Sequence, residues 1–177
     1  MISIINPSIR PHRVPRGFTL IETLVAIAIL MISIAGPLVI ASKALNAALY
    51  AKDQSAATFL AQEEMEIIKN IRDNNLFAGA SWDNGGLSLC AGSGAKCDFV
   101  VINGGQSSIC PSAGCQLYAS GDGYDHDSTG SVTPFSRHFY LVPVGANEYQ
   151  AVAVVSWYEG TIPNVVSVSS EFVNAAR

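Results

Sequence analysis

The sequence predicts an α+β protein: a long N-terminal α-helix, its first half membrane-spanning, followed by a head built around a C-terminal antiparallel β-sheet. Residues 23–42 carry no formal charge, helical periodicity continues to about Ile71, and short β-branched runs lie near the C-terminus. The length of 177 residues fits one compact domain plus an appendage, because single domains commonly contain about 100 to 200 residues. We therefore expect one anchor and one head.

The uncharged stretch predicts the anchor. Between Glu22 and Lys43 lie 20 residues without formal charge, enough for a helix to cross a hydrocarbon core of roughly 30 Å at about 1.5 Å per residue. A secretory signal peptide also has a basic start and an apolar core, but that core is only about 7 to 15 residues long. No clear small-x-small cleavage site follows the run at once. We expect a transmembrane segment at about 18–42.

The helix is expected to continue past the membrane, so that residues 18–73 form one long helix. Apolar residues recur at spacings of three, four or seven, and polar residues fall mainly on the other side. The apolar positions are Leu38, Ala41, Leu45, Ala48, Leu49, Ala56, Phe59, Leu60, Ile67, Ile68 and Ile71. The polar positions are Lys43, Asn46, Asp53, Gln62, Glu66, Lys69 and Asp73.

The charge distribution indicates orientation and argues against nucleic-acid binding. Arg10, Arg13 and Arg16 are the only charged residues before Glu22, and beyond residue 17 there remain 7 Lys and Arg against 14 Asp and Glu, a net charge of −7. Basic residues before an apolar span hold the N-terminus in the cytoplasm, so the head is expected outside the cytoplasmic membrane. Such an acidic body has no basic surface for neutralising phosphates, so no nucleic acid partner is evident.

Residues 16–24 read Arg-Gly-Phe-Thr-Leu-Ile-Glu-Thr-Leu and lead directly into the apolar run. This string closely resembles the type IV prepilin processing and methylation motif. The resemblance implies that a membrane-embedded aspartic prepilin peptidase removes a basic leader, 1–17, by cutting between Gly17 and Phe18. It also implies N-methylation of the Phe18 amine and a role for Glu22 in docking into a filament. The implied partners are pilin or pseudopilin subunits, the peptidase/methyltransferase, an inner-membrane assembly platform and membrane lipid.

The physical properties of these residues agree with the resemblance. Gly17 has no side chain, so an extended backbone there can approach a protease closely. A carboxylate at Glu22, on the edge of an apolar span, is costly unless a partner offsets its lost hydration. In a filament the resemblance implies that this partner is the Phe18 amine of a neighbouring subunit. The alternative is that Glu22 is an interfacial residue among lipid headgroups.

Gly36 and Pro37 interrupt the apolar helix. Proline removes a backbone hydrogen bond and glycine lowers helix propensity, so the pair is expected to kink or locally unwind the helix. Membrane helices also tolerate such pairs as simple bends. Pilins that resemble this chain often carry a helix-breaking residue here, and their helices can melt at this point in a filament.

The head is expected to span residues 74–177. Residues 74–137 are predicted to be loop-rich, and runs at 139–144, 149–157 and 165–172 are predicted as antiparallel strands laid on the outer half of the helix, as in the pilin fold. The run from Val152 to Trp157 resembles the late strand of minor pilins and of I-type minor pseudopilins of type II secretion. Trp157 is interpreted as a packing residue, since an aromatic side chain in a strand usually packs.

The four cysteines, Cys90, Cys97, Cys110 and Cys115, all lie in the loop-rich part of the head. Neither the C-x6-C nor the C-x4-C spacing fits a common zinc ribbon, which uses C-x2-C. In an oxidising compartment disulfides are favoured. Of the three possible pairings we expect the sequential one, Cys90 with Cys97 and Cys110 with Cys115, because short loops close readily.

Asp125, Asp127 and Thr129 match the first half of a calcium-binding loop, with Gly130 at the turn. The second half fails, because Ser136 stands where a bidentate glutamate is expected. Asp122 would be a further ligand. A polar hairpin turn explains the same residues, so calcium is only a weak candidate and no other cofactor is expected.

No catalytic motif is present in the sequence. After removal of the leader the histidines are His126 and His138, and there is no Gly-x-Ser-x-Gly elbow, complete phosphate loop or His-Glu-x-x-His motif. A tethered enzyme or binding protein outside the membrane is the alternative from another class. The interpretation favoured here is a non-enzymatic filament subunit, a minor pilin, with a minor type II pseudopilin as the alternative. Its expected location is the cytoplasmic membrane and then an extracellular or periplasmic filament.

Overall fold

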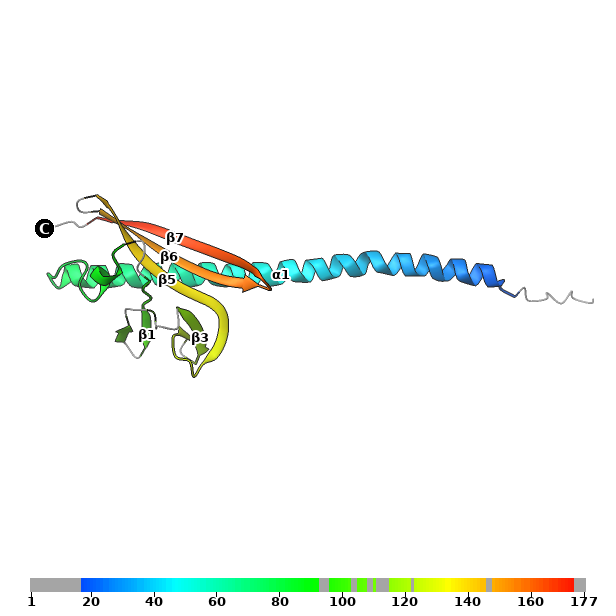
Figure 1. The fold of residues 1–177 in the computed structure, drawn as a ribbon, viewed down its shortest axis with the longest axis horizontal. Coiled ribbons are helices and arrows are strands. Elements are labelled where there is room, and N and C mark those ends of the chain that lie inside the picture. The colour runs from blue at the N-terminus through cyan, green and yellow to red at the C-terminus, as the bar shows by residue number, and fades with distance from the viewer. Residues whose placement is uncertain are drawn as a thin grey trace, which may run out of the picture. The chain divides into compact units, whose positions relative to one another are not determined.

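The computed structural model describes residues 17–92, 96–102, 105–107, 110, 115–121, 123–145 and 148–173. The chain divides into two compact units, Met1–Asn46 and Ala47–Arg177. Helix α1, Leu20–Phe77, contributes residues to both units (Figure 1). The remaining elements all belong to the second unit, called the head below. Asp122 lies outside the described residues.

Local capping sets the two ends of α1. At the start, the Glu22 amide donates to Thr19 Oγ1 at 3.3 Å, and Thr19 and Glu22 have the Thr-x-x-Glu spacing of a capping box. At the end, Gly79 adopts a left-handed φ of 70°, which a glycine accepts without steric cost just after a helix. The helix therefore ends at Phe77 rather than near residue 73, where the sequence pattern placed its end.

In the first unit, α1 is long and apolar enough to cross a membrane. Its large apolar side chains are exposed there. The helix is continuous through Gly36 and Pro37, so the local unwinding expected at this pair is absent from the structure. Proline removes only one backbone donor, and the hydrogen bonds of the adjacent turns are sufficient to keep the helix intact.

In the head, α1 buries a stripe with helical spacing. The stripe consists of Ala57, Leu60, Ala61, Glu64, Met65, Ile68 and Ile71. The predicted apolar face includes Leu60, Ile68 and Ile71, which are buried, but also Phe59, which is 71% exposed. The sheet covers one side of the helix only, so a second apolar side remains at the surface.

The main sheet has five antiparallel strands in the order β4-β3-β5-β6-β7. The long strands are β5 (Ser131–Gly145), β6 (Glu148–Glu159) and β7 (Ile162–Val173) (Figure 1). The short strands are β3 (Gln116–Ser120) and β4 (Gly123–Asp125). A helix packed against an antiparallel sheet confirms the α+β, pilin-like architecture that the sequence predicts.

The region expected to be loop-rich contains more structure than the sequence indicates. It includes the 3₁₀ helix η1 (Leu87–Cys90) and a separate two-stranded sheet of β1 (Val100–Ile102) and β2 (Gly105–Ser107). It also contains β3, β4 and the first part of β5. That prediction was wrong for these segments, because their strands are too short or too polar to show alternation.

The core lies between α1 and the inner face of the sheet. Alternate residues of β5 and β6 point inward, and those of β6 include Ala151 and Ala153, both fully buried. Trp157 is 2% exposed and lies 6.2 Å from the ring centroid of Tyr50 on α1. Each large apolar side chain buried in this way contributes about 1.5–3 kcal/mol. Trp157 is therefore a packing residue, as the sequence analysis interpreted it.

Candidate processing site and a buried charge network

The residues of the processing motif lie at the exposed start of α1. Gly17 and Phe18 precede the helix, and the Phe18 side chain is 81% exposed. No atom lies within 4 Å of a Cβ built on Gly17. Among the described residues, none hydrogen-bonds or forms an ion pair with the Glu22 carboxylate. A peptide bond between Gly17 and Phe18 in this conformation is accessible and not yet part of a helix.

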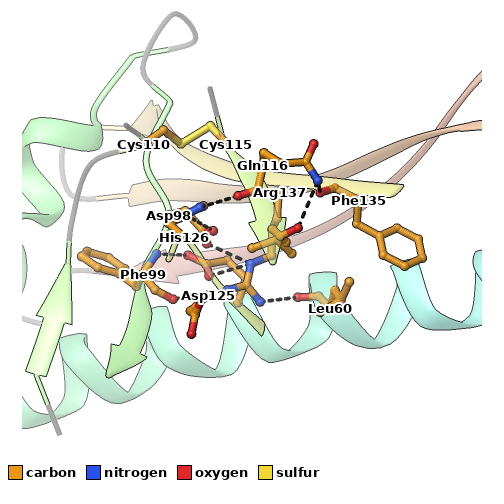
Figure 2. A network of polar contacts seen from close by, with 12 residues as sticks. Leu60, Asp98, Phe99, Cys110, Cys115, Gln116, Asp125, His126, Phe135 and Arg137 are labelled. Carbon is orange, nitrogen blue, oxygen red and sulfur yellow. Dashed lines mark hydrogen bonds and ion pairs between the residues drawn. A yellow bond between two sulfur atoms is a disulfide. The ribbon is translucent and has the colours of Figure 1, made fainter. Parts of the chain in front are cut away.

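The head contains a different kind of site, a network of charged side chains buried between α1, β5 and the loop before β1 (Figure 2). Arg137 on β5 is 1% exposed. Its Nε donates to Asp98 Oδ1 at 2.9 Å, and its Nη1 donates to Glu63 Oε2 at 3.0 Å. Nη1 and Nη2 also donate to the carbonyl oxygens of Leu60 and Phe99, at 3.3 and 3.4 Å. One guanidinium thus joins three separate segments of the head.

Glu64 on α1 is the second buried carboxyl group of the network and is fully buried. Its Oε1 accepts a hydrogen bond from the Phe99 amide at 3.2 Å, and its Oε2 lies 3.4 Å from Arg137 Nε. Burial, followed by the negative charge of Asp98, raises the pKa of Glu64 well above its ordinary value, although Arg137 opposes this shift. Burial therefore favours the protonated form of Glu64 over its ionised form.

His126, in the turn after β4, has an acceptor at each ring nitrogen. Nδ1 lies 2.8 Å from the Gln116 carbonyl oxygen, and Nε2 lies 2.7 Å from Asp98 Oδ2. Because a carbonyl oxygen and a carboxylate oxygen both accept, an imidazolium, which donates from both nitrogens, suits the two contacts. Burial alone would lower the pKa of His126, but its bonds to Asp98 and to the Gln116 carbonyl raise the pKa overall.

The network brings basic and acidic side chains together. Arg137 and His126 are the basic residues, and Glu63, Glu64 and Asp98 are the acidic ones. Buried ions are tolerated when they are paired and hydrogen-bonded in this way. The network reaches the surface at Glu63, whose side chain is 56% exposed.

Two disulfides flank the groups that hold His126. Cys90 is bonded to Cys97, directly before Asp98, and Cys110 is bonded to Cys115, directly before Gln116. These are the sequential pairs. The Phe139 amide donates to the Cys97 carbonyl at 2.6 Å, and the Arg137 amide donates to that of Cys115 at 2.9 Å. Both disulfides are therefore tied to β5.

Asp125 and Asp127, the weak calcium candidates, are already used as turn-forming acceptors. Asp125 Oδ1 accepts from the Asp127 amide at 2.9 Å and its Oδ2 accepts from the Ser120 hydroxyl at 2.8 Å. Asp127 Oδ1 accepts from the Thr129 amide at 2.9 Å. Across the part of the chain that the structure describes, no group of three or more His, Cys, Asp or Glu residues is arranged to hold a metal ion.

A shallow groove of about 390 Å³ lies beside the network. It is lined by Ala56, Phe59, Leu60, Glu63 and Tyr124. The groove is largely apolar, and Glu63 contributes the one carboxyl group among its lining residues. The same carboxylate that pairs with Arg137 thus forms part of the groove wall.

Sequence reasoning missed the network, although two signals for it were available. Glu64 follows Leu60 and precedes Ile68 by four residues, so it lies on an otherwise apolar helical stripe. Arg137 precedes Phe139 by two residues, so in a strand the two share a face. Charged residues at core-facing positions indicate buried pairs.

A family model described as the prokaryotic N-terminal methylation motif matches residues 13–36. This segment carries the type IV prepilin-like signature and contains Gly17, Phe18, Glu22 and Gly36. No curated protein and no solved structure matches the chain.

Proposed function

We propose, from the prepilin-like signature at residues 13–36, that this chain is a minor subunit of a type IV pilus or a closely related filament. A prepilin peptidase cuts it between Gly17 and Phe18, and the Phe18 amine is then methylated. The observation that carries the proposal is the placement of this signature at the start of an exposed helix apolar enough to cross a membrane. The head faces the outside of the cytoplasmic membrane before the subunit enters the filament.

The geometry at Gly17 supports cleavage. A protease binds its substrate as extended backbone, and α1 begins only at Leu20. A glycine before the cut leaves room for the active site, whereas a bulky side chain would not. The bond to be cut therefore lies just before the helix and not within it.

The geometry at Glu22 supports docking between subunits. Within the residues that the structure describes, its carboxylate has no partner, and its helical neighbours Ile21 and Val25 are exposed apolar residues. A positive amine on Phe18 of an adjacent subunit would offset the cost of placing this charge among apolar helices. The pair would also fix how far one helix is shifted along its neighbour in the filament. The next 20 residues carry no charge and so offer no competing ion pair.

The family of this motif is structural rather than catalytic, and we propose no reaction for the chain. The minor role rests on the likeness of the run from Val152 to Trp157 to late strands of minor subunits. A minor subunit should be far less abundant in sheared filaments than the major one. A minor pseudopilin of a type II secretion system remains the alternative, and loss of that protein would block secretion of folded substrates instead of changing surface filaments.

The test separates processing from assembly in cells that retain the normal partner subunits. Gly17→Val should leave full-length precursor in the membrane. Gly36→Val is the matched control, because a Cβ at Gly36 also meets no atom within 4 Å, and it should be cut normally. Immunoblots of membranes report the size of the chain. Normal cleavage of Gly17→Val would contradict the prepilin assignment.

Glu22→Val should preserve insertion and cleavage but sharply reduce the amount of the chain in sheared filaments. Insertion should improve slightly, since a charge leaves the apolar segment. Glu66→Val, an exposed change elsewhere on α1, is the control and should enter filaments normally. Assembly of the Glu22 variant at the native level would contradict the docking role.

A further inference from the structure

The two edges of the main sheet differ in how well they are protected against pairing with another chain. The β4 edge is three residues long and ends at Asp125. The neighbouring β3–β5 pair has a register shift between Gln116 and Tyr118. Short strands, charges and irregular register are the usual means by which proteins protect a sheet edge. The β4 edge is therefore a poor template for a further strand.

The β7 edge has few of these protections. All twelve of its residues pair with β6 in continuous register. In the described part of the chain, no strand pairs with the outer side of β7. Pro163 is at its second position, and Glu171 is its only charged residue. The stretch 164–170, Asn-Val-Val-Ser-Val-Ser-Ser, contains no charge, proline or glycine.

The outer side of β7 offers a specific kind of binding surface. Along an edge strand, every second residue directs its backbone N–H and C=O away from the sheet. An extended polypeptide satisfies these groups with a ladder of hydrogen bonds and fits its side chains between those of the edge. Val165, 61% exposed, and the exposed Ser167 and Ser169 lie on the outward face of the strand. The matching ligand is thus another strand.

Charges at the ends of β7 decide which strand can pair there. Glu159 is opposite Ile162 at the start of β7, and Glu148 is opposite Val173 at its end, close to Glu171. All three carboxylates are exposed, and no Lys or Arg lies on β6 or β7. Arg72 on α1 lies over the buried Phe172 ring and is paired with Asp73, so the exposed groups at both ends of the edge are carboxylates. The best partner therefore carries Lys or Arg near the ends of an uncharged central stretch.

A second copy of this chain fits this edge poorly. Two β7 strands side by side in parallel would bring Glu171 close to Glu171. In the antiparallel arrangement the Glu171 end of each copy would meet the Glu159 end of the other. The β4 edge of a second copy is too short to cover β7. Like charges placed opposite each other destabilise a strand pair, so a self-pair is disfavoured in both directions.

We infer that β7 is a docking edge for an extended, basic-ended strand of a different subunit of the same filament. This inference rests on the proposed function, which places the chain among other pilin-like subunits. Strand addition would join the two heads into one continuous sheet. It would also cover the exposed edge that, in an isolated head, is prone to non-specific pairing.

A photo-crosslinking experiment tests the inference on the full-length chain in cells that retain the normal partner subunits. A benzophenone amino acid replaces Ser169 on the β7 edge or, as the control, Ser156 on β6. Ser156 pairs with Ser136 on one side and Val165 on the other, and lies on the same face of the sheet. The probe at 169 should yield an adduct to another filament subunit, roughly tenfold more than the probe at 156. The crosslinked peptide should map to an extended, basic-ended segment.

Charge variants provide the second measurement. Lysine on an edge strand is a common protection against pairing with another chain. Ser167→Lys combined with Ser169→Lys places lysines on β7 and should reduce co-isolation of the partner subunit roughly fivefold. Glu171→Lys should reduce it as well, because it removes the attraction for a basic strand end. Ser156→Lys is the control for an added lysine on the same face and should leave co-isolation unchanged.

The outcomes separate this inference from the function on which it rests. An adduct with a second copy, no adduct at 169, or edge variants that behave like the native chain would overturn the docking edge. These results would leave cleavage after Gly17 and entry into filaments intact. A chain that is never cut and never found in filaments would overturn the proposed function and this inference together.

Discussion

The first half of α1 and the head treat charge in opposite ways. In the first half of α1, Glu22 is exposed and has no partner among the described residues. In the head, Arg137, Asp98 and Glu64 are almost completely buried and compensate one another. One region therefore leaves its charge without a described partner, whereas the other pairs its buried charges with one another.

This difference makes the head measurable by itself. The chain has two tryptophans, and both, Trp82 and Trp157, lie in the head and are buried. Their fluorescence during unfolding of the full-length chain in detergent therefore reports on the head and not on the apolar segment.

Removing the central cation should have the largest effect. Arg137→Met leaves Asp98 buried without its guanidinium, and breaking a buried ion pair in this way costs about 3–5 kcal/mol. Lys69→Met removes an exposed pair with Glu66 and should cost less than about 1 kcal/mol. Denaturant unfolding followed by tryptophan fluorescence gives both values. If both variants lost the same small amount of unfolding free energy, the buried ion pairs of Arg137 would not stabilise the head.

The disulfides should have the next largest effect. The two disulfides close loops with sequence separations of 7 and 5. By restricting the unfolded chain, each should stabilise the folded head by about 2 kcal/mol. Cys90→Ser with Cys97→Ser should cost more than the other pair, because it also loosens Asp98. Non-reduced mature protein should contain four fewer hydrogens than the reduced form. Four alkylatable thiols in native filaments would contradict the pairing.

The sequence predicts best those parts of the molecule whose interacting residues are close together in the chain. The helix and the strands β5 to β7 follow from periodicity within single segments, and the processing motif is contiguous. The charge network depends on residues far apart in the chain: Glu64 contacts Phe99 across 35 positions, and Arg137 contacts Leu60 across 77. Composition and spacing do not show which distant charges meet. The short strands β3 and β4 were missed because three to five residues carry no clear alternation.

The pH dependence of the head should have a smaller but diagnostic effect. The pKa of His126 is raised in the fold, so its stabilisation is complete below the ordinary value of 6.5 and is lost as pH rises through the folded pKa. The raised pKa of Glu64 acts in the same direction, with its loss beginning above 4.5. The head should therefore lose stability as pH rises above about 6.5, because His126 loses its proton and with it one of its two contacts.

Two variants isolate this effect. His126→Gln should flatten the decline above about pH 6.5. His138 is the matched control: burial, followed by the charge of Lys96, lowers its pKa, so its contribution is present above pH 6.5 and lost as pH falls. His138→Gln should therefore leave the alkaline decline in place. A His126→Gln profile identical to that of the native chain would show that its doubly bonded imidazolium does not stabilise the head.

Calcium should have the smallest effect, because the carboxylates that resemble half of a calcium loop already have partners. Asp125 holds the Asp127 amide and the Ser120 hydroxyl, and Asp127 holds the Thr129 amide. The hydrogen bonds from Thr129 lower the pKa of Asp127, as expected for a carboxylate that serves as a turn acceptor. Added calcium or a chelator should leave the melting temperature of the head unchanged, since only an ion bound to the native state would shift it. Asp125→Ala with Asp127→Ala should lower that temperature to the same extent with and without calcium. A stabilisation by calcium that this double variant abolishes would show that the turn binds the ion.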